Sequence, residues 1–491
     1  MFELMEPPAS VEPSALLDEM RAASRSETRA AAQRLTAVWQ LYRVRLREWG
    51  DGDNAAVDTW DAVAAEVAAA LNTSLGSAGN LVRFALAMHE RLPLVGMVLA
   101  AGDIDYRLFQ TIVYRTDLIT DADTLAAVDT QLAARAPRWT SLSYGKLSRE
   151  VDRIVAAADA DAVRRRKERA EEREVVVADS GDGMAVVYAN VFSTDGRALD
   201  QRLDALAATV CDKDPRTAAQ RRADAIGAVA AGADRLSCRC GTDDCCAGGK
   251  LPASPVVLHL LADQATVDGA SDKSGYLVGY DDLIPAELVA ELAKSAKTRP
   301  LFDPVDAPPE PGYVPSAKLA EFVRCRDMTC RAPGCDQPAT HCDIDHTVPH
   351  GKGGLTHPSN LKCLCRRHHL LKTFGGWRDK QLPDGTVIWT LPDGQMYVTT
   401  PGSALLFPNL CRPTGELAEP NPPAEDRCGN RNAMMPKRRR SRAQNRAHRV
   451  AAERRQNRQA REARRKACDA YHAELFAPHD DEHGDGEPPP F

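Results

Sequence analysis

The chain has 491 residues, 43% of them hydrophobic, and a formal net charge of −6. This length is enough for more than one folded unit, and the low aromatic content of 5%, together with alanine-rich runs, favours helices over sheets. No apolar run reaches the roughly 18 residues that suggest a membrane helix, and the first residues lack a basic segment followed by an apolar one. We therefore expect no membrane association, no secretory signal and a cytoplasmic location.

The first part of the chain has helical character. Residues 1–13 are rich in proline and are expected to be a disordered start, whereas residues 14–300 are predicted to form a mainly helical domain with a small sheet. Residues 64–71 and 78–88 have the rhythm of a helix-turn-helix, which is more often typical of ordinary helix packing than of DNA recognition. The residues whose spacing indicates one buried helix face are Leu35, Val38, Trp39, Tyr42, Leu46 and Trp49.

The second half of this predicted domain mixes helices with short strands. Residues 164–173 alternate in charge at helical spacing, which is typical of a solvated helix face. Valine-rich runs on both sides of a glycine-containing turn predict a β-hairpin over residues 175–188. A helix is expected from about residue 195 to 235, and another strand over residues 256–261.

Fourteen cysteines are many for a chain expected in a reducing compartment, where disulfides rarely persist. Their clustering therefore favours metal ligation. The first cluster has tighter spacing than an ordinary zinc ribbon and no distant second pair, so it is either a metal site or a reduced, cysteine-rich surface loop. Its members are Cys238, Cys240, Cys245 and Cys246.

The second cluster follows a proline-rich stretch. Prolines mark residues 301–320 as a linker. Residues 321–410 then contain two short pairs of metal-binding residues with 29 residues between the pairs. Two such pairs of soft or borderline ligands predict a closed, tetrahedral site for structural Zn²⁺. The four candidate zinc ligands are Cys330, Cys335, Cys365 and His368.

Residues with the chemistry for phosphodiester hydrolysis lie between and beside these pairs. His346 can take a proton from water near neutral pH, while Asp345 and His369 can together hold one Mg²⁺ or Mn²⁺ that stabilises negative charge. Adjacent strand residues point to opposite faces, so Asp345 and His346 need a local twist to share one site. Cys342 and Cys363 are expected in the core, although either could replace a proposed zinc ligand.

This region resembles the HNH endonuclease family. The matching elements are Asp345-His346, Asn360-Leu361 and residues 365–369, with His368 at a position where many relatives have cysteine. The resemblance implies a β-hairpin and helix around a divalent metal, with His346 as general base and Asp345 and His369 as ligands. It also implies that Asn360 fixes the loop and the orientation of His346.

The whole chain is similar to the actinobacterial thirteen-E-twelve repeat family, which joins a mainly helical N-terminal domain of unknown function to a C-terminal HNH module. The predicted fold class is α+β, with a zinc-braced ββα-metal module and a basic helical or disordered tail. The segments that carry the similarity are residues 324–327, 343–349, 357–365, 377–379 and 382–386.

The last part of the chain divides into a meander and a tail. Two Pro-Asp-Gly turns predict three strands over residues 377–400. Residues 411–491 form a low-complexity tail with an acidic end, in which residues 437–466 carry fourteen Lys or Arg and two Glu, a local charge of +12. Subtracting this local charge from the net charge of −6 leaves −18 for the rest of the chain. Without an apolar stripe, the basic segment either binds a polyanion, is screened by the acidic end, or is a solvated tail without a partner.

The predicted function is that of a metal-dependent DNA endonuclease without a small-molecule cofactor. The alternative is a non-catalytic, zinc-containing DNA-binding protein. Cationic side chains near the module and in the tail are expected to contact phosphates. They are Lys352, Arg366, Arg367, Lys372, Arg438, Arg439 and Arg440.

Overall fold

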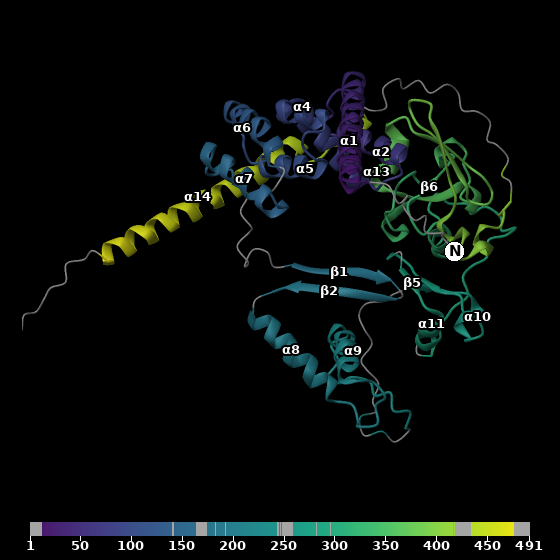
Figure 1. The fold of residues 1–491 in the computed structure, drawn as a ribbon. Coiled ribbons are helices and arrows are strands. Elements are labelled where there is room, and N and C mark those ends of the chain that lie inside the picture. The colour runs from purple at the N-terminus through teal and green to yellow at the C-terminus, as the bar shows by residue number, and fades with distance from the viewer. Residues whose placement is uncertain are drawn as a thin grey trace, which may run out of the picture. The chain divides into compact units, whose positions relative to one another are not determined.

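The computed structural model shows a mixed α+β protein, as predicted (Figure 1). It describes residues 12–139, 142–163, 174–181, 183–191, 193–242, 245, 247, 259–280, 282–294, 296–415, 417 and 434–475. The chain forms two compact units. Unit 1 comprises residues 1–67, 75–165 and 435–491, and unit 2 comprises residues 68–74 and 166–434. The predicted domain over residues 14–300 is therefore divided between the two units, and the basic segment shares a unit with the N-terminal helices.

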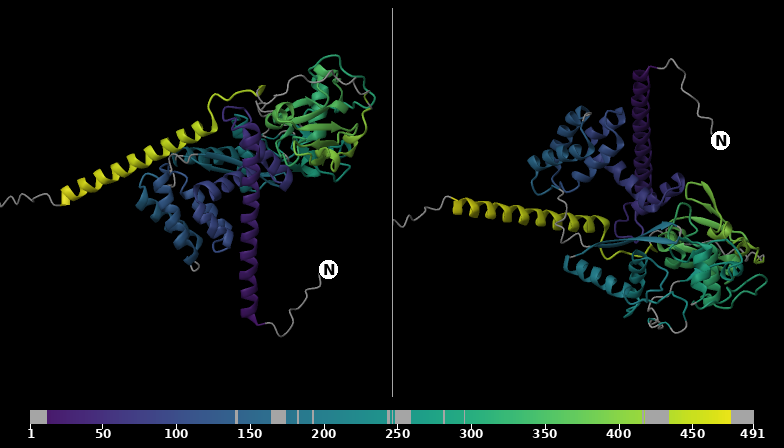
Figure 2. Two further views of the ribbon diagram at one scale, coloured as in Figure 1. Left: turned by 90° about the horizontal axis from the view of Figure 1, so that it is seen from above. Right: turned by 60° about the horizontal axis from the view of Figure 1, so that its bottom comes forward.

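Unit 1 is helical. The predicted helix face around Leu35 lies on α1, a long continuous helix (Figure 2). The side chain of Leu35 is fully buried, as are those of Val82, Leu99 and Ile112 from three other helices. The helices are α1 (Pro13–Trp49), α2 (Thr59–Leu71), α3 (Leu75–Leu86), α4 (Pro93–Ala101), α5 (Tyr106–Arg115), α6 (Ala122–Arg135), α7 (Tyr144–Ala158) and α14 (Arg442–Leu475), with a π-helical turn at Ala87–Arg91.

The start of α4 shows how buried polar groups are satisfied in this unit. Pro93 is the first residue of the helix, and the carboxylate of the buried Asp129 accepts the N–H groups of Leu94 and Val95 at 2.9 and 3.0 Å. A carboxylate at a helix N-terminus is favoured by the helix dipole. Among the described residues, no single helix has the length and apolar character needed to cross a membrane; the pair Leu75–Arg91 and Pro93–Ala101 meets that requirement only when taken together, across a bend of 111°.

Ion pairs attach the basic segment to the rest of unit 1. Helix α14 has no apolar stripe, as predicted, and its arginines pair with acidic residues that precede or follow the other helices. These acidic partners were not predicted from the sequence. The acidic end that was expected to screen the basic segment, residues 480–487, lies outside the described part of the chain. The contacts include Arg438 and Arg442 with Asp58 at 2.8 and 2.9 Å, Arg446 with Asp117 at 2.8 Å, Arg454 with Asp159 at 2.6 Å, and Arg458 with Asp161 at 3.0 Å.

Unit 2 begins with the predicted hairpin, β1 (Glu174–Gly181) and β2 (Met184–Asn190). The predicted helix over 195–235 is two helices, α8 (Ser193–Ala207) and α9 (Ala218–Ala230), because Thr217 caps a new helix with a capping box. The predicted strand over 256–261 is observed only at its end, and residues 251–258, like 164–173, lie outside the described residues. A small antiparallel sheet follows, with β3 (Leu260–Leu261), β4 (Gly275–Leu277) and β5 (Asp282–Ile284), beside α10 (Gln264–Val267) and α11 (Ala286–Ala293).

The C-terminal module of unit 2 contains a hairpin followed by a helix. The strands β6 (Cys342–His346) and β7 (Leu361–Cys365) pair antiparallel, from Cys342 opposite Cys365 to His346 opposite Leu361, and α13 (Arg366–Phe374) follows directly. The predicted meander is confirmed as β8 (Arg378–Gln381), β9 (Val387–Thr390) and β10 (Met396–Thr399), with β9 in the centre. Helix α12 (Ala317–Asp327) begins inside the predicted linker, where Ser316 caps it.

Buried charges connect α12 to the hairpin. The carboxylate of Asp327 accepts the backbone N–H of Cys363 at 2.7 Å, and Arg326 donates to the carbonyls of Pro358 and Leu361 at 2.9 and 2.7 Å. Arg326 also donates to Asp327 at 2.8 Å. Both side chains are almost completely excluded from solvent. Arg331, also buried, lies 3.8 Å from the same carboxylate. Removing one of these buried charges is expected to be costly, because its partners would be left uncompensated.

Candidate metal and active site

The four predicted zinc ligands come together. Their ligand atoms all lie within 4.8 Å of one another. The Nδ1 atom of His368 is 3.3 Å from the Cys365 sulfur and 3.5 Å from the Cys330 sulfur, and Cys335 and Cys365 are 3.9 Å apart at sulfur. Tetrahedral zinc with bonds of about 2.3 Å to sulfur and 2.0 Å to nitrogen places its ligand atoms roughly 3.5–3.8 Å apart. These four residues can therefore hold a metal ion.

The neighbouring cysteines are core residues, as expected. Cys363 is fully buried, and the Cys342 thiol donates to the carbonyl of Pro338 at 3.4 Å. The backbone N–H of Cys365 donates to the Cys330 sulfur at 3.3 Å, a contact that favours a thiolate. Among the described residues, the metal-ligand cluster of this module contains neither Cys342 nor Cys363.

A carboxylate that was not predicted orients His369. Asp343 lies two residues before Asp345 on β6, and its Oδ2 is 2.8 Å from Nδ1 of His369. Since a carboxylate only accepts, Nδ1 is the donor in this contact. The other ring nitrogen, Nε2, lies 3.5 Å from Oδ1 of Asp345. Two ligands of one Mg²⁺ with bonds of about 2.1 Å lie roughly 3 Å apart, so Asp345 and His369 can reach one ion after a small shift.

The second oxygen of Asp345 already has partners. Its Oδ2 accepts from Lys362 at 2.7 Å and from Lys372 at 2.6 Å, and Asp379 pairs with Lys362 on the far side at 2.5 Å. Burial alone raises the pKa of Asp345, but the two ammonium groups outweigh it and lower the pKa to about 2. The side chain of Lys372, predicted to contact phosphate, is 10% exposed here; burial and Lys362 lower its pKa to about 8.

His346 is buried and lies against two aromatic rings. Its Nε2 is 2.9 Å from the hydroxyl of Thr356, which itself donates to the carbonyl of Gly312 at 2.6 Å. Because the Thr356 hydroxyl donates its proton to Gly312, it accepts from the imidazole, so Nε2 of His346 is the protonated nitrogen and Nδ1 carries the lone pair. Tyr313 stacks on the imidazole with ring centres 5.3 Å apart, and His350 meets its edge at 5.7 Å. Burial lowers the pKa of His346 to about 4, so the ring is neutral at pH 7.

Asn360 fixes the loop between the two strands. Its Oδ1 accepts the N–H of Val348 at 2.8 Å, and its Nδ2 donates to the carbonyls of Val348 and Leu355 at 3.1 and 2.9 Å. Gly354 makes this closure possible, because a Cβ there would lie 1.8 Å from the Val348 carbonyl oxygen. The loop that follows His346 is therefore held at three points by one amide side chain.

The other predicted phosphate contacts lie in different environments. Arg366 is exposed and pairs with Asp343 at 3.4 Å, while Lys352 and Arg367 are half-buried. Arg439 and Arg440 are exposed. Arg438 donates to Asp58, to Asp61 and to the carbonyl of Ala56 within unit 1.

Three residues at the site were missed from the sequence. Asp343 could have been found, since positions two apart on a strand share a face. Thr356 and Tyr313 gave no such signal, because both act through contacts between segments that are distant along the chain. Tyr313 lies in the predicted linker, whose Glu310 pairs with Thr356 through the backbone at 2.9 Å. The proline-rich stretch is therefore part of the site rather than a spacer.

Comparison with known proteins identifies the chain's relatives. A protein-family model described as a domain of unknown function, DUF222, matches residues 22–327. The uncharacterized protein Rv3776 of Mycobacterium tuberculosis is 45% identical over 471 residues, which cover 90% of this chain and 89% of the relative. The uncharacterized protein Rv2100 of the same species is 42% identical over 528 residues, covering 97% and 92%. No solved structure matches the chain. The chain therefore belongs to the DUF222 family.

Proposed function

We propose that this protein is a metal-dependent endonuclease of the HNH type, which hydrolyses phosphodiester bonds in DNA. The β6–β7 hairpin followed by α13 supports this proposal, since it presents Asp345, His346, Asn360 and His369 in the order that the HNH family uses. The relatives are uncharacterized, so the argument depends on the geometry of this site.

The observation that carries the proposal is the pair of contacts made by the two ring nitrogens of His369. A histidine that binds a metal usually donates its other ring N–H to a carboxylate or carbonyl. Asp343 accepts from Nδ1 at 2.8 Å, and Nε2 lies 3.5 Å from Oδ1 of Asp345, the second proposed ligand. A histidine on a helix surface would not need such an arrangement.

Asp345 and His369 would hold Mg²⁺ or Mn²⁺. When bound, the ion supplies positive charge that stabilises the phosphate and the departing oxygen during hydrolysis. His346 accepts a proton from the attacking water at Nδ1, because its Nε2–H is committed to Thr356. Tyr313 stacks on the ring and limits its rotation, while Asn360 holds the loop that follows.

The Cys330, Cys335, Cys365 and His368 cluster is proposed to hold structural Zn²⁺. Four protein ligands leave no open position for water or substrate, which is the arrangement of structural rather than catalytic zinc. The cluster joins the turn after α12 to the end of β7 and the first turn of α13. It therefore fixes the helix on which His369 lies.

One observation favours the alternative of a non-catalytic DNA-binding protein. Oδ2 of Asp345 is saturated by Lys362 and Lys372, and the four groups Asp345, Asp379, Lys362 and Lys372 balance in charge. Such a network can stabilise the module without any catalytic metal. The two functions are distinguished by cleavage, since both predict DNA binding.

The test is a nicking assay on supercoiled DNA with the purified full chain in Mg²⁺ and in Mn²⁺. His346→Ala should lower the rate by about 100- to 10,000-fold, the usual contribution of a general base. His341→Ala is the matched control, because His341 is exposed and its ring contacts only the side chain of Gln337 among the described residues. If wild type and His346→Ala cut equally, or neither cuts while both bind DNA equally, the nuclease proposal is wrong.

A further inference from the structure

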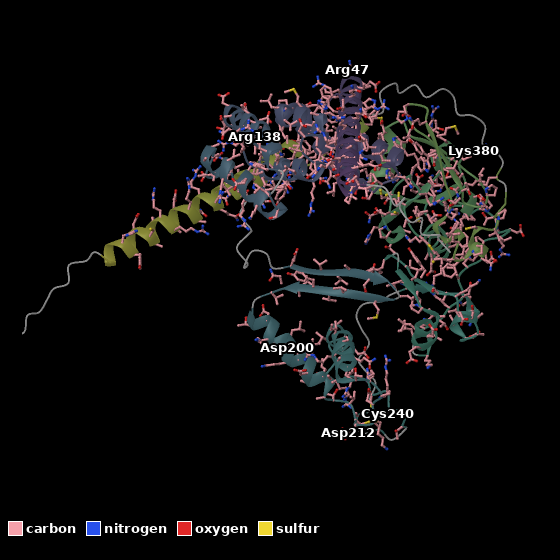
Figure 3. All side chains as sticks on the ribbon, in the orientation of Figure 1. Arg47, Arg138, Asp200, Asp212, Cys240 and Lys380 are labelled. Atoms are coloured by element: carbon pink, nitrogen blue, oxygen red, sulfur yellow. The ribbon has the colours of Figure 1, made fainter. Side chains whose placement is uncertain are left out.

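A second set of thiols comes together in the α8–α9 part of unit 2. Cys238, Cys240 and Cys245, three members of the first predicted cluster, follow α9. Cys211, from the connection between α8 and α9, joins them. The four sulfur atoms lie within 4.8 Å of one another. Cys246 lies outside the described residues. Figure 3 shows Cys240 at the end of this helical pair, close to Asp212 in the same connection.

The distances suit a shared metal. The sulfurs of Cys211 and Cys238 are 3.5 Å apart. Four thiolates around one Zn²⁺ at about 2.3 Å lie roughly 3.8 Å from one another. A disulfide needs about 2.05 Å, and the described cysteines are all free. The spacing is therefore that of ligands around a common centre.

Buried polar contacts hold the two cysteine-bearing loops in place. Arg216 donates to both carboxylate oxygens of Asp214 at 3.0 and 2.7 Å and to the carbonyl of Ser237 at 2.6 Å. Asp214 also accepts the backbone N–H of Arg239 at 2.9 Å. Both side chains are nine-tenths or more buried. The loop with Cys211 is thus attached to the loop with Cys238 and Cys240 at residues immediately beside the thiols.

The hydrophobic core of this part is too small to account for its order by itself. It consists of small and medium side chains, half of them alanine, and a core of that size contributes little free energy. The thiols are half-buried, unlike the fully buried Cys363 of the other module. Cys238 also packs against the hydrophobic core of this part, but packing alone does not require four half-buried thiols to face one another. The buried core residues are Leu206, Val210, Ala225, Ala228, Ala233 and Leu236.

We propose that Cys211, Cys238, Cys240 and Cys245 bind one Zn²⁺ in a closed tetrathiolate site that stabilises the α8–α9 part. Binding displaces the thiol protons, so that the ion is held by sulfur anions. All four positions are taken by protein ligands, which makes the site structural. The proposal does not depend on nuclease activity.

The experiment measures zinc per chain in the purified, reduced full-length protein. Wild type should carry two zinc ions, one for each cluster. Cys211→Ser and Cys335→Ser should each lose one of the two, and the double variant both. Cys468→Ser is the matched control, because Cys468 is exposed on α14 and belongs to neither cluster. It should keep both ions.

A second pair of variants separates loss of a ligand from loss of fold. Cys240→His retains a zinc ligand and should keep two ions, whereas Cys240→Ser should lose one. Cobalt substituted into Cys335→Ser should give the spectrum of a tetrathiolate site, since only the cluster that contains Cys211 then remains. The proposal is overturned if Cys211→Ser keeps the wild-type zinc content, if wild type carries a single ion that only Cys335→Ser removes, or if the cluster that contains Cys211 holds iron.

Discussion

The two units use different interactions to hold together segments that are distant along the chain. In unit 1, arginines of α14 pair with aspartates more than 290 residues earlier, as with Arg446 and Asp117 or Arg454 and Asp159. In unit 2, clusters of thiols and one imidazole join segments within 38 residues. Paired charges are screened by salt and titrate with pH, whereas metal ligands release their ion to a chelator. Unit 1 is therefore expected to be sensitive to salt and pH, and unit 2 to a chelator.

The largest expected effect is zinc removal. Structural zinc contributes about 10–16 kcal/mol in small domains at pH 7, so a chelator should unfold the C-terminal module of unit 2 and leave the helices of unit 1 folded. Limited proteolysis with and without chelator checks this. Fragments containing α1–α7 should persist while those containing β6 and α13 disappear. Equal protection of both units would contradict the comparison.

Loss of a buried charge should come next. Asp327→Ala leaves Arg326 buried without its carboxylate and removes the acceptor for the Cys363 N–H. Breaking a buried pair in this way typically costs about 3–5 kcal/mol. Denaturant unfolding of the zinc-loaded protein measures it. Asp272→Ala, in an exposed loop of the same unit, is the control and should change stability by less than about 0.5 kcal/mol.

A smaller effect is expected from Asp343→Asn, which keeps the shape of the side chain and removes its charge. The amide can no longer secure the proton on Nδ1 of His369, so Nε2 is less often available as a ligand. Removing the hydrogen-bond partner of a metal ligand usually lowers metal affinity or activity by about 10- to 100-fold. The activity should fall by this factor at low Mn²⁺ and recover partly at high Mn²⁺. Asp336→Asn, exposed beside Cys335, should behave as wild type; a loss that extra metal does not reduce would argue against a ligand-orienting role.

The smallest expected effect concerns the attachment of α14. Burial raises the pKa of Asp117, but Arg446, Arg83 and Arg91 outweigh it and hold the pKa below its usual value. The ionised form is therefore favoured by folding, and this stability is present above the unfolded pKa of about 4 and lost as the pH falls below it.

Wild type and Asp117→Asn test this directly. Wild type should be more stable by about 1–2 kcal/mol at pH 7, and the difference should shrink as the pH approaches 3. Thermal unfolding of the two proteins across this range measures the effect. Glu27→Gln, exposed in the middle of α1, is the matched control and should show no such trend. A difference that grows toward acid pH would mean that the sign of the linkage is wrong.

Local patterns predicted the parts of the molecule that depend on neighbours along the chain. The spacing of Cys330, Cys335, Cys365 and His368 identified a cluster that the structure brings together. The Pro-Asp-Gly turns located the meander, and the valine runs located the first hairpin. Each of these signals arises within a short stretch of sequence, where spacing and turn chemistry are enough.

Contacts between distant segments could not be read in this way. Cys211 is 27 residues from Cys238, and only the folding of α8 against α9 makes it the fourth thiol. The aspartates that receive the arginines of α14 carry no mark in the sequence that distinguishes them from other surface acids. The burial of Lys372 similarly depends on Asp345 and Asp379, which lie on two different strands.

The docking of α14 has a consequence for the order of synthesis. Unit 2 is almost continuous in the chain, so its thiol clusters can assemble as soon as residue 434 has left the ribosome. Asp159 and Asp161 must wait for their arginine partners on α14, the last described element to be made. During that interval these two carboxylates lack the ion pairs that they form in the complete chain. Translation that stops before Arg442 would therefore leave unit 1 without the arginines that pair with Asp159 and Asp161.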